Sequence, residues 1–291
     1  MTDILTHPDA SPLPTHIPSV VALHHGHGDP VASTWQIAVE MPVQISINGA
    51  PRTVMLATPS ALDDLARGLA VSERWVAVPT AIRSVAVSSF LREISVDLTV
   101  DPSALLEAAG SARSMAANTG CGLCGIETLA ALQSRPDRLR TEQLHVRDFA
   151  VRRAFDALAS HQPLNAMTRS VHAAAWCSMD GSIRLVREDV GRHNALDKVI
   201  GALAADDVLQ EPGFVVMTSR CSYELVYKAT AANTQLLATI SAPTSMAIEW
   251  ARALDLPLAS TMHMQDGTRV LVHFPQRVDA PALSPLPVHG R

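Results

Sequence analysis

Apolar and polar positions alternate with a period of two in the first third of the chain, and this pattern predicts strands. The segments that show it are residues 35–39, residues 43–47, a run near Val54 and a pair of runs within residues 83–100. Asn48-Gly49 predicts the turn between the second and third of these strands. Apolar residues at positions 62, 65, 66, 69 and 70 then change to helical spacing, and Thr58-Pro59-Ser60 predicts the start of that helix.

Strand and helix patterns alternate repeatedly in the second half of the chain. Strands are predicted at residues 173–178, 183–187, 214–217, 236–240, 256–260 and 270–274. The first two are joined by an Asp180-Gly181 turn, and helices are predicted from about Asn194, Ser222 and Met246. This order predicts an α/β fold with a largely parallel sheet that is covered by helices on both faces.

The patterns divide the chain into four parts. Residues 1–30 are rich in Pro, His, Asp and Ser and are predicted to be a flexible leader. Residues 31–144 form a smaller N-terminal α+β region, and residues 145–276 form the α/β domain. Residues 277–291 contain three further prolines and are predicted to be a tail.

Composition narrows the class of protein. The 291 residues are 47% hydrophobic and carry a net charge of −5, so the chain has no general affinity for nucleic acid or for an anionic membrane. The 23 basic side chains are 21 arginines and two lysines, and none precedes Arg52. Because the start lacks the basic and apolar regions of a secretory signal, and no apolar run has membrane-spanning length, we expect a soluble cytoplasmic protein.

The most informative segment is Asn118-Thr-Gly-Cys-Gly-Leu-Cys-Gly-Ile-Glu127, which places Cys121 and Cys124 in a Cys-x-x-Cys spacing. Glycines leave the backbone free to present both sulfur atoms, and the apolar pattern that follows predicts a short helix. A helix N-terminus favours thiolate over thiol, so the pair suits sulfur or electron exchange.

Three other interpretations of this cysteine pair are possible, and an observation counts against each. A structural zinc site needs two more ligands, and there is no second Cys-x-x-Cys. A thioredoxin-like dithiol lacks its usual aromatic residue before the first cysteine. A disulfide staple is not needed by a chain of this size. We therefore predict no metal site.

Three predicted junctions, each from a strand to a helix, are polar: residues 188–198, 218–224 and 241–245. In an α/β sheet, ligands bind where strands end and helices begin. Arg192 and Arg220 suit phosphate oxygens, and Ser241 and Thr244 can donate hydrogen bonds to them. Together the junctions predict an anionic ligand, and a nucleotide fits best.

The junctions also contain two aspartates and several residues that are typical of helix caps. Asp189 and Asp197 are predicted to accept hydrogen bonds from sugar hydroxyls or base amines. The alternative is ordinary helix capping, because Ser222 and Ser241 are standard N-cap residues and Pro243 is a standard first-turn residue.

Residues 40–277 resemble the FdhD family of formate dehydrogenase accessory sulfurtransferases. The resemblance lies in Asn118-Thr-Gly-Cys-Gly-Leu-Cys-Gly125, Glu188-Asp-Val-Gly-Arg-His-Asn-Ala-Leu-Asp-Lys198, Arg220 with Ser222, Glu224 and Lys228, and Ser241-Ala-Pro-Thr244. It implies a cytidine-deaminase-like αβα core and a homodimer. It also implies a relay of sulfur from a cysteine desulfurase to the molybdenum bis-guanine-dinucleotide cofactor, which is bound as substrate and is needed for formate dehydrogenase activity.

The resemblance also implies roles for individual residues. Cys121 would carry the sulfur as a persulfide and Cys124 would be its partner. A GDP-like nucleotide portion would bind elsewhere, at His193, Arg220, Ser222, Ser241, Thr244, Thr261 and His263. The loop at residues 261–267 departs from the family pattern because it has lost an arginine.

Of two rival functions, one is excluded by the sequence and one remains. Zinc deaminases need His-x-Glu and Pro-Cys-x-x-Cys, and this chain has neither, so deamination is excluded. A chaperone that binds and delivers the guanylated molybdenum cofactor without sulfur chemistry stays as the alternative.

Overall fold

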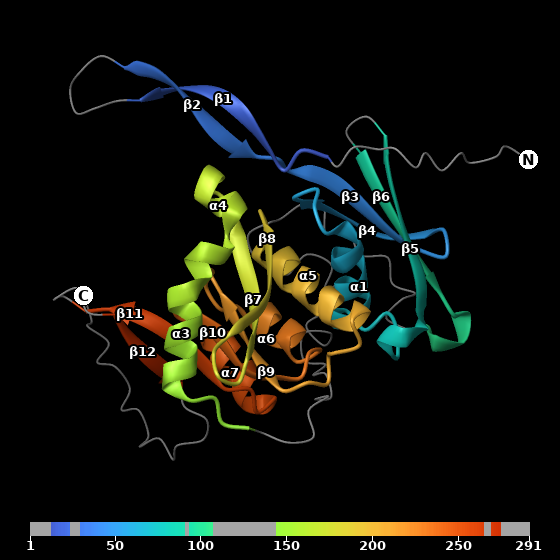
Figure 1. The fold of residues 1–291 in the computed structure, drawn as a ribbon. Coiled ribbons are helices and arrows are strands. Elements are labelled where there is room, and N and C mark those ends of the chain that lie inside the picture. The colour runs from blue at the N-terminus through green and yellow to red at the C-terminus, as the bar shows by residue number, and fades with distance from the viewer. Residues whose placement is uncertain (1–12, 24–29, 91–92, 107–143, 265–268, 275–291) are drawn as a thin grey trace, which may run out of the picture.

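The computed structural model describes residues 13–23, 30–90, 93–106, 144–264 and 269–274 (Figure 1). In this part of the chain the strands form sheets of two, four and six strands. Membrane-spanning helices need about 20 apolar residues, and the described residues contain no helix of that length and character. The predicted mixed α/β class is confirmed.

The six-stranded sheet has the strand order β12-β11-β10-β9-β7-β8. Its strands are β7 His172–Ser178, β8 Ile183–Asp189, β9 Gly213–Met217, β10 Thr234–Thr239, β11 Leu258–His263 and β12 Arg269–Phe274. Only β9–β10 and β10–β11 pair in parallel, while the other three pairings are antiparallel. The prediction of a largely parallel sheet is therefore wrong. The turn at Gly181, where φ is 86°, folds β8 back against β7 as predicted, but β7 also runs antiparallel to β9, and β12 runs antiparallel to β11.

Helices cover both faces of this sheet, as predicted. Side chains alternate along each strand, so that Ala175 and Cys177 of β7 face one way and Ala174 and Trp176 the other. The first face packs against α3 Asp148–Leu158. The second packs against α5 Arg192–Ala205, α6 Tyr223–Ala229 and α7 Ser245–Ala253 (Figure 1). The carboxyl ends of β9, β10 and β11 therefore lie at the edge where α6 and α7 begin.

The four-stranded sheet and α1 Leu62–Ser72 form a further layer beyond α5. The strands are β3 Met41–Ile47, β4 Ala50–Ala57, β5 Ile82–Phe90 and β6 Glu93–Val100, in the order β4-β3-β6-β5. All four were predicted. Buried side chains of this layer and of the six-stranded sheet belong to one hydrophobic core, so the two predicted regions pack as one body.

Helices α1 and α5 approach closely through two glycines. A Cβ built on Gly68 would overlap the backbone carbonyl of Asp197, and one on Gly201 would overlap that of Asp64. The helix at residues 62–72 is confirmed, but its predicted cap is wrong. The N-cap residue is Ala61, in a left-handed conformation, and the Thr58 hydroxyl accepts a hydrogen bond from the Val190 N–H instead, at 3.1 Å.

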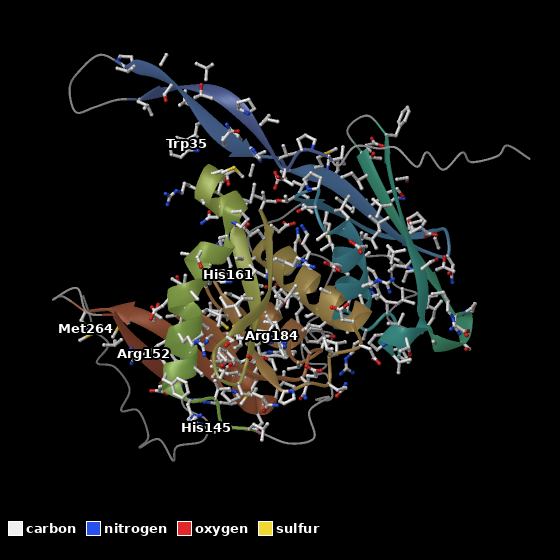
Figure 2. The ribbon with its side chains drawn as sticks, viewed as in Figure 1. Trp35, His145, Arg152, His161, Arg184 and Met264 are labelled. Atoms are coloured by element: carbon white, nitrogen blue, oxygen red, sulfur yellow. The ribbon has the colours of Figure 1, made fainter. Side chains whose placement is uncertain are left out.

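The prediction that residues 1–30 are a flexible leader is wrong for residues 16–23, which form one strand of a two-stranded ribbon. Strand β1 His16–Leu23 pairs in antiparallel fashion with β2 Val31–Ala38 and projects beside α4 Pro163–Thr168 (Figure 1). Trp35 points from β2 toward α4, and its Nε1–H donates to the Thr168 carbonyl at 3.3 Å (Figure 2). The strand was missed because proline is typical of loops, although an edge strand such as β1 tolerates Pro18.

Short 3₁₀ turns complete the described elements. They are Pro79–Ala81, Pro102–Ala104 and Ala159–His161. The predicted tail at residues 277–291 lies outside the described residues, as does the segment at residues 107–143 that contains the Cys-x-x-Cys pair.

Candidate functional site

The three predicted polar junctions meet at one edge of the six-stranded sheet. The Thr244 N–H donates to the Cys221 carbonyl at 3.0 Å, and the Ser241 N–H donates to the Ser219 carbonyl at 3.4 Å. These bonds hold the loop after β10 against the loop after β9. The first turn of α5, which carries His193, reaches the same place. The prediction that the junctions share an edge is confirmed.

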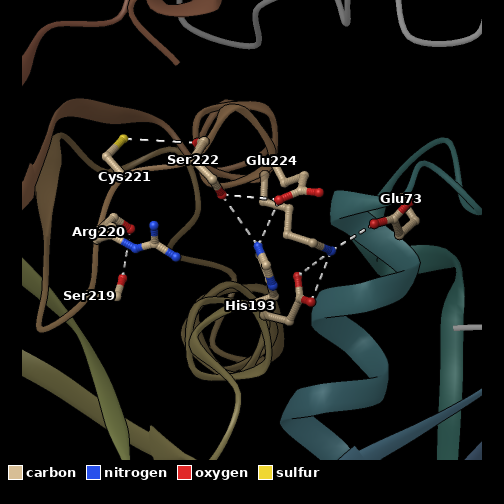
Figure 3. A network of polar contacts seen from close by, with 9 residues as sticks. Glu73, His193, Ser219, Arg220, Cys221, Ser222 and Glu224 are labelled. Carbon is tan, nitrogen blue, oxygen red and sulfur yellow. Dashed lines mark hydrogen bonds and ion pairs between the residues drawn. The ribbon is translucent and has the colours of Figure 1, made fainter. Parts of the chain in front are cut away.

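Five side chains at this edge form what we call the edge cluster: His193, Arg220, Ser222 and Glu224, which Figure 3 shows, and Arg192, which lies close to Glu224 and Arg220. His193 Nε2 lies 3.0 Å from Glu224 Oε2. The Ser222 hydroxyl donates to the same carboxylate oxygen at 3.1 Å and lies 3.5 Å from His193 Nε2. The exposed fractions of the His193 and Glu224 side chains are 22% and 12%, so solvent reaches the cluster from one side.

The contact with Glu224 assigns a donor role to Nε2 of His193. An ionised carboxylate only accepts hydrogen bonds, so we assign the proton to Nε2, which donates to Glu224. A serine–histidine–acid triad has the acid at the other ring nitrogen. Because the acid and the hydroxyl of this cluster both approach Nε2, the arrangement does not activate Ser222 as a nucleophile.

Positive charge surrounds the pair formed by His193 and Glu224. Burial lowers the pKa of Arg192, while the nearby carboxylate of Glu224 opposes that shift and the charge of Arg220 adds to it. His172, at the start of β7, also has a lowered pKa because of burial and then because of Arg192. Figure 3 shows Arg220 on the β9–α6 loop with its side chain extending to the side where His193 lies. Two arginines against one carboxylate leave the edge cluster with a cationic excess, which suits an anionic ligand.

Two atoms of the edge cluster are buried without a partner. Glu224 Oε1 and Arg192 Nε make no hydrogen bond with the described residues, although neither is exposed to water. A buried polar atom that lacks a partner costs free energy, so a ligand that satisfied either atom would gain affinity.

Other predicted contacts of the nucleotide are partly occupied. Thr244 caps α7, because its hydroxyl accepts from the Ala247 N–H at 3.3 Å. The Thr261 hydroxyl donates to the Ile240 carbonyl at 3.1 Å. Ser222 stands at the N-cap of α6, yet its side chain bonds Glu224 and makes no cap bond. Ser241 is exposed.

Three predicted residues are not tested by the described structure. Cys121 and Cys124 lie outside the described residues. His263 ends β11, and its side chain lies outside them too.

The predicted roles of Asp189 and Asp197 are wrong, because both carboxylates are buried in ion pairs. Asp189 Oδ2 lies 2.6 Å from Lys198 Nζ, and neither side chain is exposed. Asp197 Oδ2 lies 2.9 Å from Lys228 Nζ, which also bonds Glu73 at 2.7 Å. We call these two groups the lysine centres. No sugar hydroxyl reaches a carboxylate that is fully enclosed and already paired.

The two described cysteines are poor nucleophiles. Cys177 lies in β7 under α3, and burial raises the pKa of its thiol to about 12. Cys221 lies beside the edge cluster, but burial also raises the pKa of its thiol to about 12. Near neutral pH both stay protonated, and a protonated thiol does not attack a persulfide.

Sequence reasoning included Glu224 in the family resemblance but assigned it no role, whereas the structure places it at the centre of the edge cluster. The available signal was its position two residues after Ser222, in the first turn of a helix at a strand end. Read alone, an acidic residue in a first turn indicates only a favourable interaction with the helix dipole.

Comparisons with known proteins place the chain in a family. The FdhD/NarQ family model matches residues 38–278. A sulfur carrier protein FdhD from Xanthomonas campestris pv. campestris is 44% identical over 243 residues, which are 84% of this chain and 85% of that protein. A sulfur carrier protein FdhD from Cupriavidus necator is 38% identical over 270 residues, 93% of this chain and 92% of that protein. The chain therefore belongs to the FdhD/NarQ family.

A solved structure supports the fold. The crystal structure of a putative formate dehydrogenase accessory protein from Desulfotalea psychrophila has a TM-score of 0.68 to this chain at 17% identity. The superposition covers 91% of this chain and 100% of that protein. The resemblance to the family that was stated from the sequence is confirmed.

Proposed function

We propose that this chain is a sulfurtransferase that carries persulfide sulfur from a cysteine desulfurase to the molybdenum bis-guanine-dinucleotide cofactor, for use by formate dehydrogenase. Membership of the FdhD/NarQ family and the names of its relatives support this proposal. The observation that carries it is the state of the cysteines. Of the four in the chain, Cys177 and Cys221 are buried with raised thiol pKa values, which leaves Cys121 and Cys124 as the candidate nucleophiles.

The proposed chemistry has two sulfur-transfer steps. The Cys121 thiolate attacks the terminal sulfur of the donor persulfide, which forms Cys121–S–S⁻ and releases the donor thiolate. The Cys124 thiolate then attacks the inner sulfur of Cys121, which forms a disulfide between the two and releases hydrosulfide to molybdenum. A dithiol reductant converts the disulfide back to two thiols before the next cycle.

The edge cluster is proposed to hold the guanine nucleotide portion of the cofactor. Arg192 and Arg220 offer planar cations to phosphate oxygens. We further propose that the protein is a cytoplasmic homodimer with the cytidine-deaminase-like layering of its family.

Intact-protein mass spectrometry after incubation with a cysteine desulfurase and cysteine tests the carrier role. We expect the wild-type chain and Cys221→Ala to gain one sulfur that a reductant removes, and Cys121→Ala to gain none. Cys221→Ala is the matched control, because it removes a thiol that burial keeps protonated. A sulfur gain in Cys121→Ala would show that the carrier is another residue.

Differential alkylation provides a second test on the native protein. Iodoacetamide near neutral pH should modify Cys121 and Cys124 and leave Cys177 and Cys221 unmodified until the chain is denatured. Modification of Cys221 at the rate of Cys121 in the folded protein would contradict its burial and the assignment of the carrier.

The second candidate function is a chaperone that binds and delivers the guanylated cofactor without sulfur chemistry. The observation that favours it is that the edge cluster contains no reactive thiol, so nucleotide binding there does not require one. Nucleotide binding by a wild-type chain that gains no sulfur would favour the chaperone.

A further inference from the structure

We propose that the apolar face of the β1–β2 ribbon is a contact surface for a second copy of this chain. This proposal rests on the proposed function, which includes a homodimer, and it names the surface through which the two copies meet. The ribbon lies almost entirely before residue 38, where the match to the FdhD/NarQ family model begins, so its role is inferred from its own residues.

The two faces of the ribbon differ in the side chains that they carry. Alternate residues of a strand share a face, and so do cross-strand partners, such as Ile17 with Ile37 and Ser19 with Trp35. Six of the eight residues on this face are apolar: Ile17, Val21, Leu23, Val31, Trp35 and Ile37. The opposite face carries Pro18, Val20, three alanines and three polar residues.

The apolar face of the ribbon is largely exposed. The exposed fractions are 49% for Ile17, 58% for Val31, 42% for Trp35 and 41% for Ile37. None of the six apolar residues belongs to either hydrophobic core of the described structure. A two-stranded ribbon is only marginally stable in water unless its apolar face packs against something, and contiguous exposed apolar surface is typical of an interaction site. The face therefore fits a partner protein.

The lack of charge on the ribbon indicates which partner covers it. Neither strand contains Asp, Glu, Lys or Arg, although these residues make up 18% of the chain. A two-fold symmetric contact uses the same patch on both copies, so a charge in it is brought close to an identical charge. An uncharged face avoids that repulsion, whereas surfaces that select a different protein commonly use complementary charges. Because the chain has a net charge of −5, a projecting uncharged ribbon is a favourable place for two copies to meet.

The two ribbons are expected to pack face to face and not edge to edge. Pro18 lies in β1, and proline is one of the features that protect an edge strand from further pairing. The other strand, β2, is held beside α4 by the hydrogen bond from Trp35 to Thr168. Packed faces of sheets lie about 10 Å apart, and eight residues of strand offer a face about 27 Å long. Met167, which precedes Thr168 in α4, is 42% exposed and adds apolar surface beside the ribbon.

Sedimentation equilibrium of the full-length protein over a range of concentrations tests this contact. We expect a reversible dimer in the wild type. Its dissociation constant should rise about tenfold or more in Val31→Glu and in Ile17→Glu, because each change places a carboxylate in the apolar contact on both copies. An apolar contact should also not weaken as the salt concentration rises.

Val20→Glu is the matched control. Val20 is 80% exposed and lies in the same ribbon on the opposite face, so this replacement adds the same charge outside the contact. Its dissociation constant should equal that of the wild type. Circular dichroism and thermal unfolding show that each variant is folded before the dissociation constants are compared.

Trp35 provides a second readout on the native protein. It is the exposed one of the four tryptophans, because Trp75, Trp176 and Trp250 have exposed fractions of 4%, 4% and 8%. Quenching of tryptophan fluorescence by acrylamide should therefore decrease as the wild-type concentration rises through the dissociation constant. In Val31→Glu the quenching should stay high over the same range.

Each of three results would contradict the proposed contact, and they lead to different conclusions. A wild-type chain that stays monomeric at every concentration would remove the homodimer together with this contact, and it would leave the role of sulfur carrier to its own test. Unchanged association of both Val31→Glu and Ile17→Glu would keep the homodimer and assign it to another surface. Dissociation of Val20→Glu to the same extent as Val31→Glu would show that association does not depend on the apolar face.

Discussion

The lysine centres and the edge cluster both include side chains of α5 and α6, and they differ in how completely their polar atoms are paired. In the lysine centres, Asp189 accepts from Thr58, Lys198, Gly191 and Asn194, and both of its oxygens are used. In the edge cluster, which includes the first residues of the same helix α5, buried atoms of Glu224 and Arg192 have no partner among the described residues. One group is enclosed and satisfied, while the other is partly open and incomplete.

This difference in pairing distinguishes residues that stabilise the fold from residues that are available to a ligand, and both kinds occur in one short segment of the sequence. Residues 188–198 supply both groups, because Asp189 and Lys198 face the interior while Arg192 and His193 face the sheet edge. The lysine centres also reach the N-terminal layer: Lys198 Nζ donates to the Thr58 carbonyl at 3.1 Å, and Lys228 pairs with Glu73. Buried pairs of this kind fix α5 and α6, so the edge cluster is held by a rigid frame.

The largest expected effect comes from breaking a lysine centre. Lys198→Met should lower the free energy of unfolding by about 3–5 kcal/mol, because it leaves the fully buried Asp189 without its cation. Chemical denaturation followed by circular dichroism measures the change.

Arg184→Met is the control for this prediction. Arg184 is an exposed cation on β8 (Figure 2), so the same type of replacement should change the free energy of unfolding by about 0.5 kcal/mol or less. If Lys198→Met were as stable as Arg184→Met, the ion pair with Asp189 would contribute nothing to the fold, and the proposed distinction between scaffold and site would fail.

Ser72→Ala should have an intermediate effect. The Ser72 hydroxyl donates to Asp197 Oδ1 at 2.6 Å and accepts from Lys228 Nζ at 3.0 Å, and all three residues are buried. Its removal leaves each charged partner one hydrogen bond short, which we expect to cost about 1–3 kcal/mol in the same denaturation experiment. Nucleotide affinity should not change, and a parallel loss of GDP binding would mean that the two groups are coupled.

The sequence predicted the elements better than their pairing. Helix spacing at residues 62–70 and the strand runs of the four-stranded sheet were sufficient, because each of these patterns reports which side chains are buried. Strand direction in the six-stranded sheet was not accessible in the same way. A buried strand has the same apolar pattern in parallel and antiparallel pairs, so the pattern did not indicate that β7 pairs in antiparallel fashion with β9.

The sequence predicted where the candidate site lies, but it predicted less well which side chains are available to a ligand there. The polar junctions share an edge because strand ends in an α/β sheet meet there. The sequence could not separate Asp189 from Glu224, since an acidic residue at a junction looks the same whether its carboxylate turns inward to a lysine or outward to a ligand. Only the lysine count carried a signal, because two lysines in 291 residues both lie in helices that leave these junctions.

In the edge cluster, Arg192→Gln should lower the affinity for GDP and leave the free energy of unfolding unchanged. The Arg192 side chain is half-buried and its Nε has no partner among the residues that the structure describes, so its replacement removes no hydrogen bond of that atom to them. We expect GDP affinity to fall about tenfold, or about 1.4 kcal/mol, with a weaker dependence on salt concentration because one cation is lost. Arg184→Gln is the matched control and should leave both quantities unchanged. Unaltered GDP affinity in Arg192→Gln would exclude Arg192 from the phosphate site.

The smallest effect on stability is expected for Glu224→Gln, a replacement within the edge cluster. Glutamine keeps an oxygen that accepts from Ser222 and His193, and it replaces a shielded carboxylate oxygen that has no partner in the described part of the chain. These changes oppose one another, so the free energy of unfolding should change by about 1 kcal/mol or less. Denaturation of this variant beside Lys198→Met compares two charged residues that lie close together on neighbouring helices. A loss of several kcal/mol in Glu224→Gln would place Glu224 with the lysine centres as part of the scaffold, because a residue that serves the ligand leaves the unliganded fold almost unchanged when it is replaced.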